Sequence, residues 1–199
     1  MGALERDEWL RAAWRLTLAQ RIDPKQLVFV DGMGTNTSLA PLRAWSPKGQ
    51  RAYCSVPPNR GKNTTVLSSI TMEGMGPSLA VQGASTAAIF ETYVERVLSP
   101  MLRPGQVVVR GNLTAHKGEK VRQLIEERGC ELMYLPPYSP DFNPIEEAFA
   151  NIKCLLPKFE GRRREALIDA IAQASSAVSV RDARGSFEHC GYHAMIQPF

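Results

Sequence analysis

The chain has 199 residues, a length that suits one domain of ordinary size. Its hydrophobic content of 44% and charged content of 22% predict a packed core and exclude an extensively disordered protein. The net charge of +4 suits a polyanionic partner such as DNA, although many proteins that never touch nucleic acid are mildly basic.

The cysteines and the apolar runs indicate the cellular compartment of the chain. Its four cysteines form no C-x-x-C pair, and no histidine lies at zinc spacing from Cys54, Cys130, Cys154 or Cys190. Free buried thiols in a reducing compartment are therefore expected. The first 22 residues mix charges with Trp and Leu, unlike a signal peptide, and no apolar run approaches the ~18 residues of a membrane span. We expect a cytoplasmic protein without a membrane partner.

The first half of the chain predicts one helix and an antiparallel sheet. Apolar residues recur at near-helical spacing over 4–19, and a linker over 21–25 leads to the apolar, β-branched run Leu27–Asp31, a predicted buried strand. Residues 32–63 are rich in Gly, Pro, Asn and Ser, which predicts turns and one or two short strands, for example 50–56. Strands over 64–71 and 78–83, joined by a turn at 73–77, complete an antiparallel meander of three with the first strand.

The second half predicts alternating helices and strands. Helices are expected over 86–98, 116–128, 145–156 and 163–177, the last clear helix, and strands over 106–110 and 131–135. A proline-rich loop over 136–144 precedes the third of these helices. A three-strand antiparallel run that feeds β-α-β units predicts an α/β fold, with a mixed central sheet and helices on both of its faces.

Polar residues gather where the predicted strands end. Asp31 ends the first strand, a segment over 111–117 follows the strand 106–110, and Glu146 and Glu147 open a helix. Carboxylates brought together at one sheet edge can hold Mg²⁺ ions about 4 Å apart for phosphoryl transfer. The alternative is structural, because an Asp at a strand end is often a turn former and a Glu pair at a helix start complements the helix dipole.

Three segments resemble known sequences. The segment Leu135-Pro-Pro-Tyr-Ser-Pro-Asp-Phe-Asn-Pro-Ile-Glu-Glu147 resembles the signature of mariner-like transposases in their bacterial insertion-sequence branch, as do 28–36 and 108–117. The resemblance runs from about Leu27 to Leu156, and weakly to 190–192. It implies a ribonuclease-H-like fold and three acids that bind two Mg²⁺ or Mn²⁺ ions, and it assigns Asp31 as the first acid and Glu146 as the third.

The second acid of the family pattern is missing. Thirty-four residues separate positions 111 and 146, as in the family, but position 111 is Gly111. A second departure is Gly32, where the family commonly has Glu. Because Gly111 offers no ligand, we expect weak metal binding and impaired catalysis. The neighbours are poor substitutes: Asn112 is neutral and points elsewhere, Asp141 is expected in a turn, and His116 favours softer metals.

Two functions follow from these residues. The first is a transposase catalytic domain for DNA cleavage and strand transfer, impaired at position 111. The alternative is an inactive DNA-binding or assembly module, and a metal-independent structural protein of the same fold is a third possibility. Gly111 is compatible with a decayed copy, an engineered substitution or a retained non-cleaving module.

The expected partners are transposon ends and target DNA. Residues 1–24 predict only a helix and linker before a catalytic domain over 25–199, and one helix cannot form the helix-turn-helix domains that recognise inverted repeats. A homodimer and a separate helix-turn-helix subunit are therefore candidate partners. The predicted phosphate contacts are Arg60, Lys62, Lys117 and Lys120, and the alternative for each is a solvated surface charge.

Overall fold

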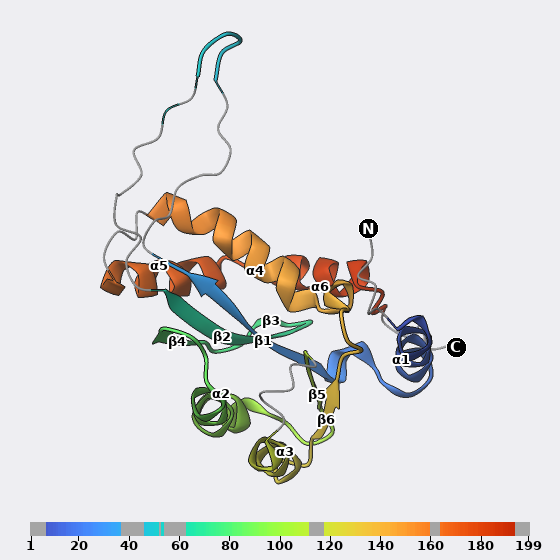
Figure 1. The fold of residues 1–199 in the computed structure, drawn as a ribbon. Coiled ribbons are helices and arrows are strands. Elements are labelled where there is room, and N and C mark those ends of the chain that lie inside the picture. Colours follow the sequence, from blue (N-terminus) through green and yellow to red (C-terminus); the bar gives the residue numbers. More distant parts are fainter. Residues whose placement is uncertain are drawn as a thin grey trace.

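A single mixed sheet organises the chain. The structure is a computed structural model, and it describes residues 7–36, 46–51, 53, 63–111, 118–159 and 164–193. Six strands form the sheet in the order β3-β2-β1-β5-β6, with β4 also paired to β2. Helices cover both faces (Figure 1). None of the helices within these ranges combines the length and apolar character that a membrane crossing requires.

The sheet joins an antiparallel part to a parallel part. Its strands are β1 (Leu27–Thr35), β2 (Thr64–Thr71), β3 (Gly74–Met75), β4 (Leu79–Gln82), β5 (Val107–Arg110) and β6 (Glu131–Tyr134). β2 is antiparallel to β1, β3 and β4, whereas β5 is parallel to both β1 and β6. The predicted meander and mixed sheet are thus confirmed. Most of the predicted strand 50–56 lies outside the described residues.

Two strands differ from the prediction. β1 continues four residues past Asp31 to Thr35, because it remains paired with β2 along that length. β3 lies within the predicted turn at 73–77, where Gly74 adopts a φ of 130°. Only glycine reaches that conformation without strain, so the chain can reverse sharply and still pair with β2.

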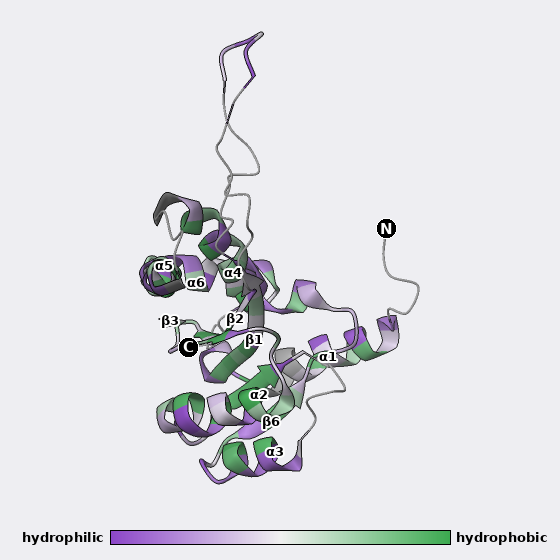
Figure 2. Ribbon diagram, turned by 60° about the vertical axis from the view of Figure 1, so that its left-hand side comes forward, coloured by the Kyte–Doolittle hydropathy of each residue, from purple (hydrophilic) through white to green (hydrophobic). Residues whose placement is uncertain are grey.

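Each face of the sheet has its own apolar core. Leu27 and Phe29 belong to the cluster beneath the helices α4, α5 and α6, whereas Val28 and Val30 belong to the cluster beneath α2 and α3. Figure 2 shows β1 and β2 enclosed between these two helical layers. Because side chains alternate along a strand, Asp31 projects to the same face as Phe29, toward α4.

The helices are α1 (Glu8–Arg21), α2 (Ala87–Tyr93), α3 (Glu119–Glu126), α4 (Pro144–Leu155), α5 (Arg164–Ser176) and α6 (Val180–His189). A π-helical turn, Val94–Leu98, extends α2. The helix α6 was not predicted. Ser179 and Asp182 form a capping box at its start, a sequence signal that marks a helix N-terminus.

The helix α1 packs against the proline-rich loop. Arg11 is fully buried, and its guanidinium donates to the Asp141 carboxylate at 3.0 and 2.6 Å and to Ser139 Oγ at 2.7 Å. The same guanidinium lies 4.1 Å from the Phe142 ring centroid. Asp141, expected only as a turn residue, is therefore the ionic partner that fixes the loop to α1.

Candidate functional site

The carboxyl ends of β1 and β5 bring positions 31 and 111 together. The parallel register pairs Val30 with Arg110, so the next residues along, Asp31 and Gly111, are neighbours. Both line one pocket of about 240 Å³. The predicted proximity of these two positions is confirmed, and it sits at the sheet edge where α/β folds commonly bind ligands.

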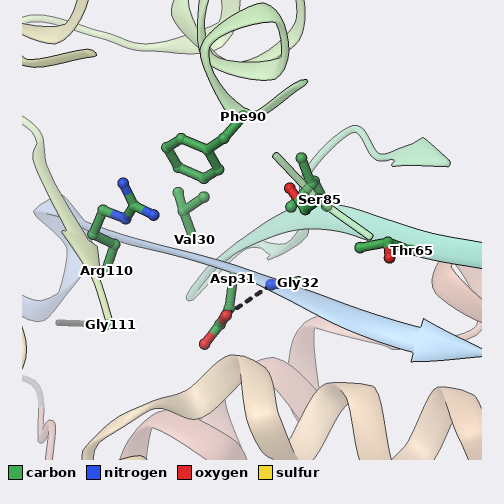
Figure 3. Close-up of a pocket in the computed structure, with 9 residues that line it drawn as sticks. Val30, Asp31, Gly32, Thr65, Ser85, Phe90, Arg110 and Gly111 are labelled. Atoms are coloured by element: carbon green, nitrogen blue, oxygen red, sulfur yellow. Dashed lines mark hydrogen bonds between the residues drawn. The ribbon is translucent and has the colours of Figure 1, made fainter. Parts of the chain in front are cut away.

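The carboxylate of Asp31 is half-buried and held on both oxygens. Its Oδ1 accepts from the Gly32 backbone N–H at 2.7 Å, and its Oδ2 accepts from Asn143 Nδ2 at 2.7 Å. Figure 3 shows this carboxylate pointing away from Phe90, toward the helix α4. Burial raises the pKa of Asp31, although the two hydrogen bonds and the charge of Arg110 oppose that rise.

Asn143 is a site residue that sequence reasoning missed. It occupies the N-cap position of α4, but its side chain makes no capping hydrogen bond, because its amide is directed at Asp31 instead. Its Oδ1 is buried without a partner among the described residues. An Asn before Pro144 at a helix start usually caps the helix. The local sequence therefore favours a capping role for Asn143 and gives no indication of its contact with Asp31.

Glu146 opens α4 close to Asp31. Partial burial of its carboxyl group raises the pKa of Glu146, and the negative charge of Asp31 raises it further, against the opposing charge of Lys153. The side chain as a whole is exposed, so the effect of burial is modest. The neighbouring Glu147 turns to a different partner and pairs with His189 Nδ1.

The loop 136–144 delivers Asn143 and Glu146 to this edge. Only one 3-10 turn, Pro140–Phe142, interrupts its irregular path, as predicted. The Tyr192 hydroxyl donates to the Phe142 carbonyl at 2.6 Å and accepts from Trp14 Nε1 at 3.3 Å. These buried contacts, together with Arg11, hold the loop from two sides.

The donor set does not fit a pair of divalent cations. Within the described ranges, no three His, Cys, Asp or Glu side chains gather closely enough to hold a metal ion. Asp31 and Glu146 supply two carboxylates, and Gly111 supplies none. Among the described residues, nothing lies within 4 Å of a Cβ built at Gly111, so the backbone there would accept a side chain.

Arg110 is a second residue that the sequence did not single out. It ends β5 after three valines, is only 6% exposed, and its guanidinium lies 3.8 Å from the Phe90 ring centroid. Burial lowers the pKa of Arg110, whereas Tyr134 and Asp31 act to raise it. An arginine remains charged in proteins, so a buried cation stands one residue from the position expected for an acid.

The predicted phosphate contacts are only partly within the described residues. Arg60, Lys62 and Lys117 lie outside them. Lys120, on α3, has its ammonium 3.3 Å from Glu95 and 3.9 Å from Glu91. These ion pairs draw the Lys120 side chain toward α2. Cys130, Cys154 and Cys190 are free thiols, as predicted, but only Cys130 is buried: Cys154, on α4, is exposed and Cys190 is partly exposed. Cys54 lies outside the described residues.

The strand order and the two helical layers define a ribonuclease-H-like fold. A family model described as DDE superfamily endonuclease matches residues 26–167. The chain belongs to this family.

Relatives and solved structures agree with that assignment. The Transposable element Tc1 transposase of Caenorhabditis elegans is 24% identical over 178 residues, which are 87% of this chain and 62% of the relative. The fold matches a Mos1 transposase paired-end complex with left transposon end, with a TM-score of 0.72, 18% identity and coverage of 94% of this chain and 59% of the other. It also matches the Mos1 transposase catalytic domain with Raltegravir and Mg, with a TM-score of 0.68, 16% identity and coverage of 94% and 90%. The chain therefore spans about three fifths of the longer relatives. The bacterial insertion-sequence branch stays a prediction.

Proposed function

We propose that this chain is a transposase catalytic domain for DNA cleavage and strand transfer, impaired because Gly111 stands where the second acid is required. One observation carries the proposal: the register of β1 and β5 sets Gly111 beside Asp31 at the edge where α4 begins with Glu146 nearby. Positions 31 and 111, which the family pattern assigns to the first and second acids, are thus neighbours, and position 111 lacks the carboxylate.

The cofactor that we propose is Mg²⁺ or Mn²⁺, bound weakly through Asp31 and Glu146. Mos1 structures described with Mg or with Mn support the choice of ion. Such an ion, when bound, would supply electrophilic stabilisation of a phosphoryl group. Two carboxylates are too few anionic ligands to hold two dications close together, so these residues do not support a two-metal reaction.

The chain's own residues orient the first acid. The Gly32 N–H and the Asn143 amide fix both oxygens of Asp31, so its carboxylate is aimed toward α4 before any ligand arrives. The loop 136–144 positions Asn143 and leads into α4. The hydrogen bond from Asn143 to Asp31 and the position of Glu146 therefore depend on the same segment. Preorganised groups of this kind are the usual way that a protein prepares a site for charge.

The proposed partner is DNA, both transposon ends and target, and Mos1 complexes described with transposon ends support it. A homodimer and a separate helix-turn-helix subunit remain proposals, as do phosphate contacts by Arg60, Lys62, Lys117 and Lys120. The alternative function, an inactive DNA-binding or assembly module, is favoured by the buried cation of Arg110 one residue before Gly111.

The test is to restore the missing acid with Gly111→Asp. A Cβ at position 111 would meet no atom of the described residues within 4 Å, so folding should survive. The matched control is Gly185→Asp on α6, an exposed glycine that also has open space around its Cβ. Calorimetry with Mg²⁺ and Mn²⁺ should give weak binding for the parent and for Gly185→Asp, and tighter binding for Gly111→Asp.

Two further measurements distinguish a site that lacks only the second acid from one that has lost more. In EDTA, Gly111→Asp should melt below the parent because a third negative charge joins Asp31 and Glu146, and Mg²⁺ should reverse that loss through binding to the folded state. Nicking of a transposon-end duplex should rise only in Gly111→Asp. Robust cleavage by the parent that is lost in Asp31→Ala would show that another residue replaces the second acid. Equal, weak metal binding by the parent and Gly111→Asp would show that the site has lost more than position 111.

A further inference from the structure

The helix α1 is apolar on the face that points away from the rest of the chain. Trp9 is 87% exposed and Leu16 is 60% exposed, and because they are seven residues apart they share one face of the helix. Ala12 and Ala13 lie between them and are exposed as well. The opposite face carries the buried Arg11, and Figure 1 shows α1 at the periphery of the molecule. A surface helix normally turns its polar side chains outward, so this outward face of α1 (Trp9, Ala12, Ala13 and Leu16) has the composition of a contact surface.

The spacing of the residues on the outward face is symmetric about its centre. Trp9 lies three positions before Ala12, and Leu16 lies three positions after Ala13. A contact across a two-fold axis must be self-complementary, because the same patch serves both copies. A second, antiparallel copy of α1 would place Trp9 of each copy against Leu16 of the other. The alanines would then meet at the axis, where small side chains let two helices approach closely.

The charges beside the outward face favour the same arrangement. Glu8 and Arg15 are both exposed and are also seven residues apart, so they lie on one flank of the face, the acid in the first turn and the base farther along. The Glu8 carboxylate is 3.6 Å from Arg11 Nε but remains 66% exposed. An antiparallel copy brings Glu8 of each copy toward Arg15 of the other, and charge pairs on the flanks of paired helices set partner choice and orientation.

We propose that the outward face of α1 pairs with the same face of a second copy of this chain, antiparallel, across a two-fold axis between Ala12 and Ala13. The family model matches residues 26–167 and does not cover this helix. Arg11 points the other way, so pairing leaves its contact with the loop 136–144 intact. The inference rests on the proposed function only for the homodimer named there, and it needs no metal ion, DNA or cleavage.

The experiment is sedimentation velocity of the full chain in EDTA, without DNA, over a range of concentrations. One helix pair is a small contact, so the parent should show a monomer–dimer equilibrium with a Kd of about 1–100 µM. Trp9→Ala alters the interface once in each copy and should raise the Kd about a hundredfold, about tenfold for each Trp. Leu16→Ala should raise it about tenfold. The matched control is Met101→Ala, because Met101 is 61% exposed, as Leu16 nearly is, but lies outside α1, and it should leave the Kd unchanged.

A charge exchange tests the antiparallel arrangement. At low salt, Glu8→Arg and Arg15→Glu should each associate more weakly than the parent, because like charges then meet across the axis. An equimolar mixture of the two variants should associate more tightly than either alone, because each variant then meets opposite charges, and circular dichroism checks that both keep their helices. A parent that stays monomeric, or equal Kd values for Trp9→Ala and Met101→Ala, would overturn the surface and leave the proposed catalytic site untouched. A mixture no tighter than its components would overturn the antiparallel pairing.

Discussion

The ion pair between Arg11 and Asp141 makes the strongest stability prediction. The two residues are 130 positions apart, and their bidentate contact joins α1 to the loop that begins α4. Asp141→Ala would remove two of the three hydrogen bonds of a fully buried guanidinium and leave the one to Ser139. The arginine cannot discharge itself, so it would remain a buried cation whose remaining counter-charge is the exposed Glu8 carboxylate, 3.6 Å from its Nε.

The exposure of Asp141 determines how much stability the Asp141→Ala substitution removes. Removing one partner of a fully buried pair costs about 3–5 kcal/mol, but the Asp141 side chain is 49% exposed, so solvent already screens part of the interaction. We therefore expect the free energy of unfolding to fall by about 2–3 kcal/mol. Because each kcal/mol moves the melting temperature of a domain of this size by about 2–4 °C, Asp141→Ala should melt about 5–10 °C below the parent.

A double-mutant cycle tests the reason for the loss. Arg11→Met removes the buried charge and keeps much of the apolar volume, so the double variant Arg11→Met with Asp141→Ala should be more stable than Asp141→Ala alone. Asp169→Ala, at an exposed position on α5, is the control and should stay within about 0.5 kcal/mol of the parent. A melting temperature for Asp141→Ala equal to that of Asp169→Ala, measured by circular dichroism, would refute the argument.

Three other changes have expected outcomes. Tyr192→Phe should cost about 1–3 kcal/mol in urea titrations, because it leaves the buried Phe142 carbonyl without its hydroxyl donor, and parental stability would show that water replaces it. Ser179→Ala should cost about 1 kcal/mol and speed hydrogen exchange at the start of α6, and unchanged exchange there would show that the capping box is dispensable. Glu146→Gln should melt at or above the parent at neutral pH. The folded-state pKa of Glu146 is raised, so its ionisation costs stability as pH rises from its ordinary value through the raised one, and the gain should vanish at acid pH. A gain that persists at acid pH would point to a cause other than charge.

Local patterns in the sequence were sufficient for most of the sheet. The apolar runs at Leu27–Asp31 and 106–110 identified two buried strands, since β-branched segments of that length are buried in sheets. The α6 helix was missed although Ser179 and Asp182 carry a recognisable capping signal, because most of its residues are polar or charged. The extension of β1 to Thr35 depends on pairing with β2, which no local pattern contains.

The contacts that organise the site are long-range, and this is why the sequence did not predict them. Asn143 and Asp31 are 112 positions apart, and Trp14 and Tyr192 are 178 apart. Propensity and periodicity describe neighbours within a few residues, so they treat Asn143 as a helix cap and Asp141 as a turn former. The positions of Asp31 and Gly111 could be predicted because parallel strands align their carboxyl ends, a rule that needs only strand direction and order.

The alternation of Arg110 and Gly111 across β5 leads to a last prediction. Arg110 projects to the α2 face, so a side chain at position 111 should project toward α4, where Asp31 and Glu146 lie. The charge of Arg110 is the smallest of the influences on the pKa of Asp31. The metal affinity gained by Gly111→Asp should therefore change by no more than about 0.5 kcal/mol when Arg110→Met is added. Calorimetry with Mg²⁺ on the parent, the two single variants and the double variant measures this coupling. A larger coupling would mean that the buried cation of Arg110 acts through the strand on the carboxylates at the α4 face.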